Sequence, residues 1–215
     1  MIRPNTAFLL CAAVACAACR TGSPSGQPPI VQPGAPGQSS HEITAAKAAD
    51  LSNVQSTPAD VKFMQGMIAH HAQAIEMTQL LATRTENEDM RKLAKRIELS
   101  QSDEIGMMQQ WLRSHGQEVP NEHAHHMMHD DGLMPGMLTQ AEMTRLAAAK
   151  GPEFDRLFLE GMIKHHGGAL TMVKELLATP AAAQESEVFA FVSDVDADQR
   201  MEIDRMADML KEMHK

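Results

Sequence analysis

The amino-acid sequence predicts an all-α protein, a four-helix bundle made from two pseudo-symmetric helical hairpins. Helix-start signals recur ahead of segments with helical apolar periodicity, and one nine-residue motif occurs twice. Aromatic residues make up only 3% of the chain. Sandwiches and barrels depend on aromatic and β-branched residues, so this composition disfavours an all-β fold. Each hairpin has an apolar face to cover, and two such faces are expected to pack together.

The N-terminal segment, residues 1–19, has the features of a secretion signal. Arg3 precedes an apolar or small stretch over residues 7–19, which is too short to cross a bilayer as a helix. Small residues precede Cys19, and the polar chain begins directly after it. We therefore expect a bacterial lipoprotein signal with lipidation at Cys19. Lipidation at Cys16, or plain cleavage without a lipid, are the alternatives.

Cysteine usage and net charge exclude several classes of function. All three cysteines lie within the first nineteen residues, so the remainder of the chain has no thiol. Disulfides, thiolate zinc sites, iron–sulfur clusters and cysteine nucleophiles are therefore excluded from the folded part. The net charge of -9 and the lack of a basic cluster argue against nucleic acid as a partner.

A tether is expected over residues 20–56, ahead of a folded domain over residues 57–215. Thirteen of the twenty residues in 21–40 are Pro, Gly or Ser, a composition that cannot bury a core and should stay extended and disordered. A short, weak helix is expected over residues 42–51.

The first hairpin is predicted from two start signals. Thr57 followed by Pro58 and then Asp60 is a helix start, and periodicity continues to about Thr83. Residues 85–88 have capping-box spacing and are expected to open a second helix, which ends near Ser114. Residues 117–138, with two prolines, are predicted to form a loop.

The second hairpin follows a short helix. Another capping box at residues 139–142 predicts that short helix, which should end near residues 150–151. A long helix is then expected from about Pro152 to Ala178. After Thr179 and Pro180 the last helix should continue almost to the C-terminus.

The strongest single feature is an internal repeat. Residues 63–71, Phe-Met-Gln-Gly-Met-Ile-Ala-His-His, recur at residues 158–166 as Phe-Leu-Glu-Gly-Met-Ile-Lys-His-His. The partner helices repeat more weakly, with Gln101, Glu104, Ile105, Met108 and Leu112 corresponding to Gln199, Glu202, Ile203, Met206 and Leu210. The repeat predicts two equivalent hairpins.

Both histidines of each repeat fall inside the apolar arc of their helix when residues are placed about 100° apart. The opposite arc of the first copy, with Lys62, Gln73 and Glu76, is expected to face water. Buried imidazoles need hydrogen-bond partners or a metal ion. Thioether and imidazole ligands favour Cu(I), and imidazole also accepts Cu(II), whereas Mg²⁺ and Ca²⁺ prefer oxygen. Met67 with His71 has the i,i+4 spacing that lets two side chains face one point, and the second copy has the same spacing.

Two further groups of residues are candidate ligands. Methionines at helical spacing are usually core residues, and both roles stay open for Met64, Met108, Met201 and Met206. The loop over residues 123–131 holds four histidines that would bind Cu(II), Ni or Zn, with a solvated polar loop as the alternative. These histidines are His123, His125, His126 and His129. The paired methionines Met134 and Met137 could cap or gate a site.

The repeated motif and the Met-Pro-Gly-Met run at residues 134–137 resemble the domain-of-unknown-function family 305. This family includes periplasmic copper-binding proteins of the CopM type. The resemblance covers roughly residues 57–212 and implies a ferritin-like bundle with Met and His copper sites and a role in copper tolerance. The family motif carries over onto Met67, His70, His71, Met77, Met162, His165, His166 and Met172. Leu159 stands where the first copy has Met64, so the two half-sites differ if Met64 is a ligand.

The sequence thus predicts an exported copper-binding protein that is not an enzyme and that serves in copper sequestration, copper tolerance or copper transfer. It would lie in the periplasm on a lipid anchor, its only contact with a membrane; by analogy, Arg20 after the anchor favours the outer membrane. A copper-handling partner protein and a homodimer are compatible with this role.

Two alternatives differ in class. One is a metal-free structural or interaction module of the cell envelope. The other is a ferritin-like metal oxidase, which needs a Glu-x-x-His motif on each of two helices. The one such motif in the chain runs from Glu122 to His125 in the expected loop.

Overall fold

The computed structural model describes residues 29–32, 39–50, 54–121 and 132–213, and the chain divides into two compact units, residues 1–51 and 52–215. In the first unit, strands β1 (Ile30–Gln32) and β2 (His41–Ile43) pair antiparallel, and helix α1 spans Ala45–Ala48. This pairing differs from the extended, disordered tether expected here. Two β-branched residues in β1 supply the strand propensity that the composition count overlooked. Helix α1 starts later than expected because the Thr44 side chain caps it by accepting from Lys47 N.

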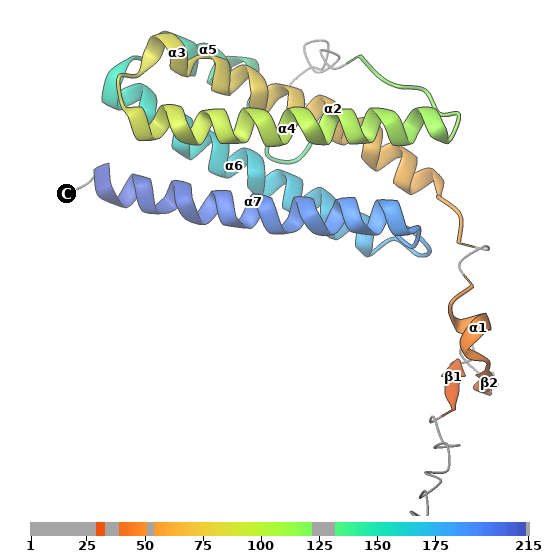
Figure 1. Ribbon diagram of the computed structural model, residues 1–215. Coiled ribbons are helices and arrows are strands. Elements are labelled where there is room, and N and C mark those ends of the chain that lie inside the picture. The colour runs from red at the N-terminus through yellow and green to blue at the C-terminus, as the bar shows by residue number, and fades with distance from the viewer. Residues whose placement is uncertain (1–28, 33–38, 51–53, 122–131, 214–215) are drawn as a thin grey trace, which may run out of the picture. The chain divides into compact units, whose positions relative to one another are not determined.

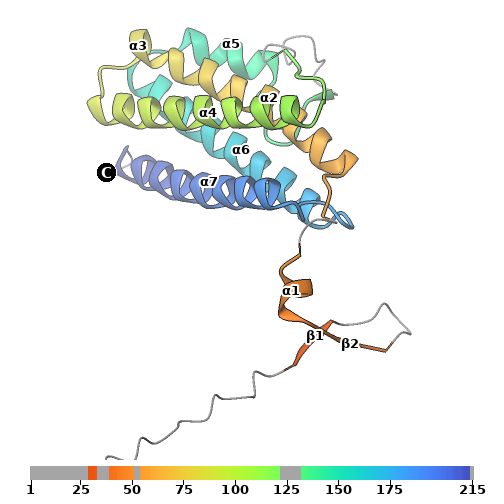
Figure 2. The same cartoon turned by 45° about the vertical axis from the view of Figure 1, so that its right-hand side comes forward.

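The second unit is an all-α bundle, as predicted. Its four long helices are α2 (Pro58–Gln79), α4 (Glu88–Ser114), α6 (Gly151–Leu177) and α7 (Ser186–Met213). Helix α2 packs on α4, α6 packs on α7, and the two hairpins meet through α2 and α6 (Figure 1). In a second view α4 and α7 again lie side by side (Figure 2). The short helices are α3 (Leu81–Arg84) and α5 (Gln140–Ala148), and α3 continues the chain after α2 ends earlier than the predicted Thr83.

Of the two predicted capping boxes one forms, at the start of α5, and the helix start predicted at Thr57 also closes as a capping box. Thr57 with Asp60 caps α2, and Thr139 with Glu142 caps α5, each with reciprocal hydrogen bonds. At α4 the expected box over residues 85–88 is wrong, because Asn87 is the cap.

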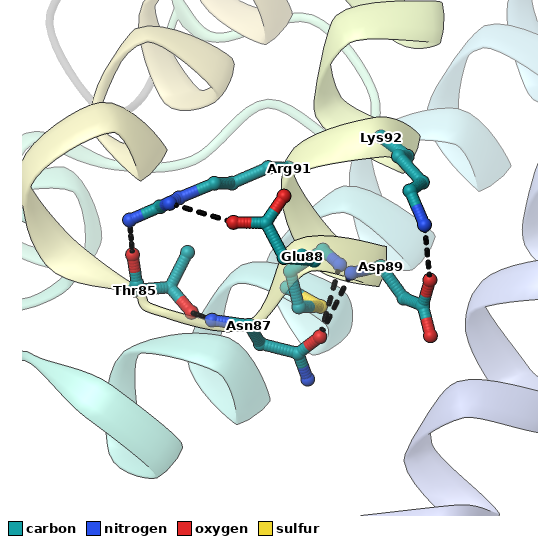
Figure 3. A network of polar contacts seen from close by, with 7 residues as sticks. Thr85, Asn87, Glu88, Asp89, Arg91 and Lys92 are labelled. Carbon is teal, nitrogen blue, oxygen red and sulfur yellow. Dashed lines mark hydrogen bonds and ion pairs between the residues drawn. The ribbon is translucent and has the colours of Figure 1, made fainter.

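The start of α4 depends on Asn87, whose side-chain oxygen accepts from Asp89 N and Met90 N (Figure 3). The Thr85 hydroxyl instead accepts from Asn87 N, and the Arg91 guanidinium donates to the Thr85 carbonyl. These contacts hold Thr85 outside the helix, so the helix begins two residues later than a Thr85 cap would place it.

The bundle core consists of two apolar clusters separated by a polar layer. Phe63 and Trp111 belong to the first cluster, and Leu93 and Phe158 belong to the second. Each long helix passes from one cluster to the other and carries buried polar residues at the crossing. These residues are His70 and His71 on α2, Gln101 and Glu104 on α4, His165 and His166 on α6, and Gln199 and Glu202 on α7.

A long crossover connects the hairpins, because α4 ends in the first cluster and α6 begins in the second. Its residues 134–138 lie against α2 and α6. The Gln73 amide donates to the Leu138 carbonyl and accepts from Leu138 N, at 2.9 and 2.7 Å. Gln73 is therefore buried, and its expected position on the solvent side of α2 is wrong. Helical periodicity predicts which face of a single amphipathic helix is apolar. It contains no information about a distant segment, here residues 134–138, that covers the opposite face.

Gly168 on α6 is required by this crossover. A Cβ atom at this position would lie 1.9 Å from the Pro135 carbonyl oxygen, whereas one at the adjacent Gly167 would meet nothing within 4 Å. The crossover backbone therefore rests directly on the α6 backbone, and no side chain fits between them.

We predict opposite effects for alanine at these two adjacent glycines. Gly168→Ala should lower the free energy of unfolding by about 3 kcal/mol or more, since the clash is with backbone. Gly167→Ala should raise it by up to about 1 kcal/mol, because alanine is the better helix former. Urea denaturation of both variants tests this, and equal stability would contradict the packing described.

Candidate metal site

The four histidines of the repeat meet in the polar layer at the centre of the bundle. Their residues are at most 1% exposed. His70 and His71 come from α2, and His165 and His166 come from α6, the two helices through which the hairpins contact each other. Their placement on the inward arcs is as predicted.

The outer histidine of each repeat is bound to a buried glutamate of its partner helix. His71 Nε2 lies 2.5 Å from Glu104 Oε2, and His166 Nε2 lies 2.7 Å from Glu202 Oε2. Both glutamates are at most 5% exposed. A carboxylate that accepts from one ring nitrogen fixes the orientation of the imidazole and makes the other nitrogen more basic.

The inner histidines contact each other across the interface between the hairpins. The ring centroids of His70 and His165 are 3.9 Å apart, at an interplanar angle of 39°. His70 Nε2 donates to the Pro135 carbonyl of the crossover at 3.0 Å. Neither ring nitrogen of His165 has a hydrogen-bond partner in the described part of the chain. The two equivalent histidines therefore have different hydrogen bonding.

Burial keeps the inner histidines neutral. Removal from water, reinforced by repulsion from His71, lowers the pKa of His70 to about 3 despite the hydrogen bond to Pro135. Removal from water and repulsion from the other three imidazoles hold the pKa of His165 well below 6.5. A neutral imidazole carries a lone pair on one nitrogen, and that lone pair can bind a metal ion.

The lone-pair nitrogens in this layer lack partners. Because Nε2 donates in His70, His71 and His166, the lone pair of each neutral ring would lie on Nδ1. The three Nδ1 atoms are buried without a hydrogen bond among the described residues, as are both ring nitrogens of His165. The amide oxygens of Gln101 and Gln199, which are equivalent in the repeat, are also buried and unpaired there. Buried polar atoms nearly always have partners, so this cluster suits an added ligand.

Thioethers adjoin the polar layer on both sides. Met64, Met67 and Met108 belong to the first apolar cluster, and Met77, Met162 and Met206 belong to the second, all at most 2% exposed. Met172 is half-buried against the first cluster. Among the described residues, no three His, Asp or Glu side chains form a ready-made metal site. A metal ion here would therefore use nitrogen and sulfur donors together, or require the side chains to move.

Several predicted site residues lie elsewhere. The loop histidines His123, His125, His126 and His129, and the lipidation candidate Cys19, lie outside the described residues. Met201 is 46% exposed, and its sulfur lies 3.6 Å from Arg96 Nη2, so the structure places it away from the buried layer. Met134 lies over Gly66 beside Met172, next to the crossover carbonyl that binds His70.

Four buried residues of the site were missed by the sequence analysis. Glu104, Glu202, Gln101 and Gln199 were placed in register by the repeat, yet no role was assigned to them. Their signal was present, since a charged residue recurring at an inward helical position needs a buried partner. The carbonyl of Pro135 leaves no signal in a sequence, because any residue could supply it.

These features define a helical-bundle protein with a duplicated, buried His–Glu layer. The family model described as Domain of unknown function (DUF305) matches residues 60–210, so the chain belongs to the DUF305 family. No match was found among curated proteins.

Solved DUF305 structures share the fold. A family member from Streptomyces coelicolor, described as secreted, is 32% identical, with a TM-score of 0.63 over 73% of this chain and 94% of that one. A fragment from Deinococcus radiodurans is also 32% identical, with a TM-score of 0.62 over 73% of this chain and 98% of that one.

CopM has been solved with bound metal and is also similar. Its Cu(I)-bound form is 26% identical, with a TM-score of 0.57 over 75% of this chain and all of that one. Its Cu(II)-bound form is 29% identical, with a TM-score of 0.56 over 71% of this chain and 96% of that one. The resemblance inferred from the repeated motif is thereby confirmed, and it connects this fold to a metal-binding protein.

Acid should destabilise the metal-free protein from about pH 6.5 downward. The folded state keeps His70 and His165 neutral, while the unfolded chain takes up protons below the ordinary pKa of 6.5. Their contribution to stability is therefore full above that pH and is lost as the pH falls toward the native pKa. Melting temperatures measured in chelator between about pH 7.5 and 5 should decline. A His70→Gln variant should decline less, and a melting temperature independent of pH over this range would contradict the prediction.

Proposed function

We propose that this chain is an exported copper-binding protein that uses Met and His ligands to sequester copper or to transfer it. The central layer of the bundle would hold the ion, with His71 and His166 as the first candidates for ligands. Copper is here the bound cargo, and no turnover is proposed.

The observation that carries this proposal is the set of buried nitrogens that have no hydrogen-bond partner among the described residues. Glu104 and Glu202 hold the Nε2 atoms of His71 and His166, which leaves their Nδ1 atoms available. A carboxylate–histidine pair of this kind is the arrangement that commonly supports a metal-bound imidazole. A purely structural histidine would be expected to satisfy both nitrogens.

The donor set favours copper over other metals. Buried thioethers flank the layer, and Met67 lies one helical turn before His71, as Met162 does before His166. Soft sulfur with imidazole suits Cu(I), and the imidazoles also accept Cu(II). CopM, a protein with the same fold, has been solved with Cu(I), Cu(II) and Ag. The donor set and the similarity to CopM together support copper as the bound metal, although neither one alone identifies the ligands in this chain.

Export is part of the same proposal. The apolar N-terminal segment and Cys19 support a lipid-anchored protein of the bacterial periplasm, with the outer membrane favoured by analogy. None of the described helices combines the length and apolar character needed to cross a membrane. A similar protein is described as secreted. A copper-handling protein partner and a homodimer fit this role.

A metal oxidase is the competing function, and one observation bears on it. Two buried His–Glu pairs in a four-helix bundle also supply part of the ligand set of a carboxylate-rich iron site. Each glutamate is, however, bound to its histidine, and the described residues do not gather three carboxylates or histidines around one point. Iron reconstitution followed by a ferroxidase assay separates the two functions, and turnover would favour the oxidase.

Removing the two glutamate-supported histidines should remove copper from the bundle. Wild-type protein purified from the periplasm of copper-fed cells should contain copper by mass spectrometry, and a His71→Gln, His166→Gln double variant should contain little. His115→Gln is the matched control, because His115 stacks on Trp111 at a ring distance of 4.2 Å, away from the layer. Equal copper content in the wild type and the double variant would indicate that copper binds in the His123–His129 loop and not in the central layer. No copper in either would refute the proposal.

The supporting carboxylates should tune the affinity without being required for it. A Glu104→Gln, Glu202→Gln variant keeps the side-chain size and removes the charges behind the imidazoles. Its Cu(I) affinity, measured against a competing chelator, should fall about 10- to 100-fold. An unchanged affinity would show that these histidines do not ligate copper.

A further inference from the structure

Two grooves lie between helices α4 and α7, one beside each apolar cluster. The first has a volume of about 460 Å³ and includes Met64, Met107, Met108, Glu187 and Asp194 in its lining. The second has a volume of about 320 Å³, and its lining includes the cations Lys92, Arg96 and Arg205, the acids Asp89 and Glu202, and Met201. Helices α4 and α7 run side by side in both views, so both grooves open along the same pair (Figures 1 and 2).

The internal repeat makes these two grooves equivalent. The register that matches Glu104 with Glu202 also matches positions 89, 93 and 96 with positions 187, 191 and 194, and position 107 with position 205. Positions 187, 191, 194 and 107 line the first groove, and their counterparts 89, 93, 96 and 205 line the second. The two halves of the molecule therefore offer the same cavity twice, with different side chains.

The charge of the two grooves is opposite. Arg96 in the second groove corresponds to Asp194 in the first, and Arg205 corresponds to Met107. In the second groove Asp89 accepts from Lys92, and Glu202 is bound to His166. In the first groove Glu187 and Asp194 have no hydrogen bond or ion pair among the described residues. The lining of the first groove is therefore net negative and that of the second is weakly net positive, so the first groove is the more favourable one for a cation.

The first groove also concentrates thioethers. Met107 is 50% exposed at its mouth, whereas Met64 and Met108 are at most 2% exposed and also belong to the apolar cluster beside the histidine layer. Exposure of a large apolar side chain at one helix position needs no explanation by itself. Three methionines around one cavity are a neutral, soft donor set. The carboxylates of Glu187 and Asp194 add a field that favours cations.

We propose that the Met107 groove is a second, solvent-accessible binding site for a soft monovalent cation, Cu(I) or Ag(I). The proposal deepens the copper-binding function proposed above and rests on it, but it uses none of the buried histidines. Met107 is the ligand that solvent reaches first, and Met64 and Met108 line the inner part of the groove. Glu187 and Asp194 raise the local cation concentration without needing to ligate.

The protein contains its own control for this site. Met201 lies in the equivalent groove on α7 and is 46% exposed, close to the exposure of Met107. It differs in its surroundings, because the Arg96 guanidinium lies 3.6 Å from its sulfur. A comparison of these two methionines therefore varies the charge of the groove while residue type and exposure stay nearly constant.

Methionine methyl NMR of the full chain tests the site with silver nitrate in chloride-free buffer. Met107→Leu and Met201→Leu variants assign the two resonances. We expect the Met107 signal to shift on addition of Ag(I) and the Met201 signal to stay in place. Met107→Leu should lower the number of bound Ag(I) ions by one, whereas Met201→Leu should not change it. Asp194→Asn should weaken binding at Met107 about two- to fivefold.

Imidazole resonances recorded in the same titration separate this proposal from the previous one. A response of Met107 without a response of the buried imidazoles would support the groove and refute the central site. A response of the imidazoles without Met107 would refute the groove alone. Equal responses of Met107 and Met201 would also overturn the groove proposal, because charge would then play no part.

Discussion

The burial of four imidazoles halfway along the bundle is the constraint on which the rest of this structure depends. Water cannot satisfy these rings, so each needs a partner supplied by the protein or by a ligand. Glu104 and Glu202 serve the outer rings, and the Pro135 carbonyl serves one inner ring. The apolar clusters on both sides then hold the four helices in the register that these contacts require.

The fold could be predicted from the sequence because its signals are local. Helical periodicity, the helix starts at Thr57 and Thr139 and the duplicated motif each act within a few turns of one helix, and they agree with one another. The two wrong predictions, the cap of α4 and the exposure of Gln73, both depend on contacts that lie outside the periodic pattern of the helix. Thr85 is displaced as the α4 cap by contacts from Asn87 and Arg91, and Gln73 is buried by a crossover more than sixty positions away in the chain. Competition between neighbouring caps and coverage by distant segments are both invisible to a periodic pattern.

The candidate site divides in the same way. The histidines could be identified because burial of a polar residue at an inward position is unusual enough to stand out. Glu104 and Glu202 fell in register but went unassigned, since a repeat alone does not say which residues touch. The charge difference between the two α4–α7 grooves required the structure, because only packing shows that Arg96 and Asp194 occupy equivalent cavities. The two halves of the chain match in the central His–Glu layer and differ in the residues that line the surface grooves. The repeated residues hold the bundle together, and the differing residues give the two grooves different charges.

The contact between His70 and His165 has a consequence for how the duplication works. Equivalent residues that touch each other lie on the pseudo-twofold axis relating the two hairpins. In an assembly of two identical hairpins, both rings on such an axis would have to share the same surroundings. Joining the hairpins in one chain removes that requirement, because the crossover is present once and its carbonyl reaches His70 alone. The connecting segment thus breaks the symmetry at its axis: His70 becomes a fixed donor, while both ring nitrogens of His165 have no partner in the part of the chain that the structure describes.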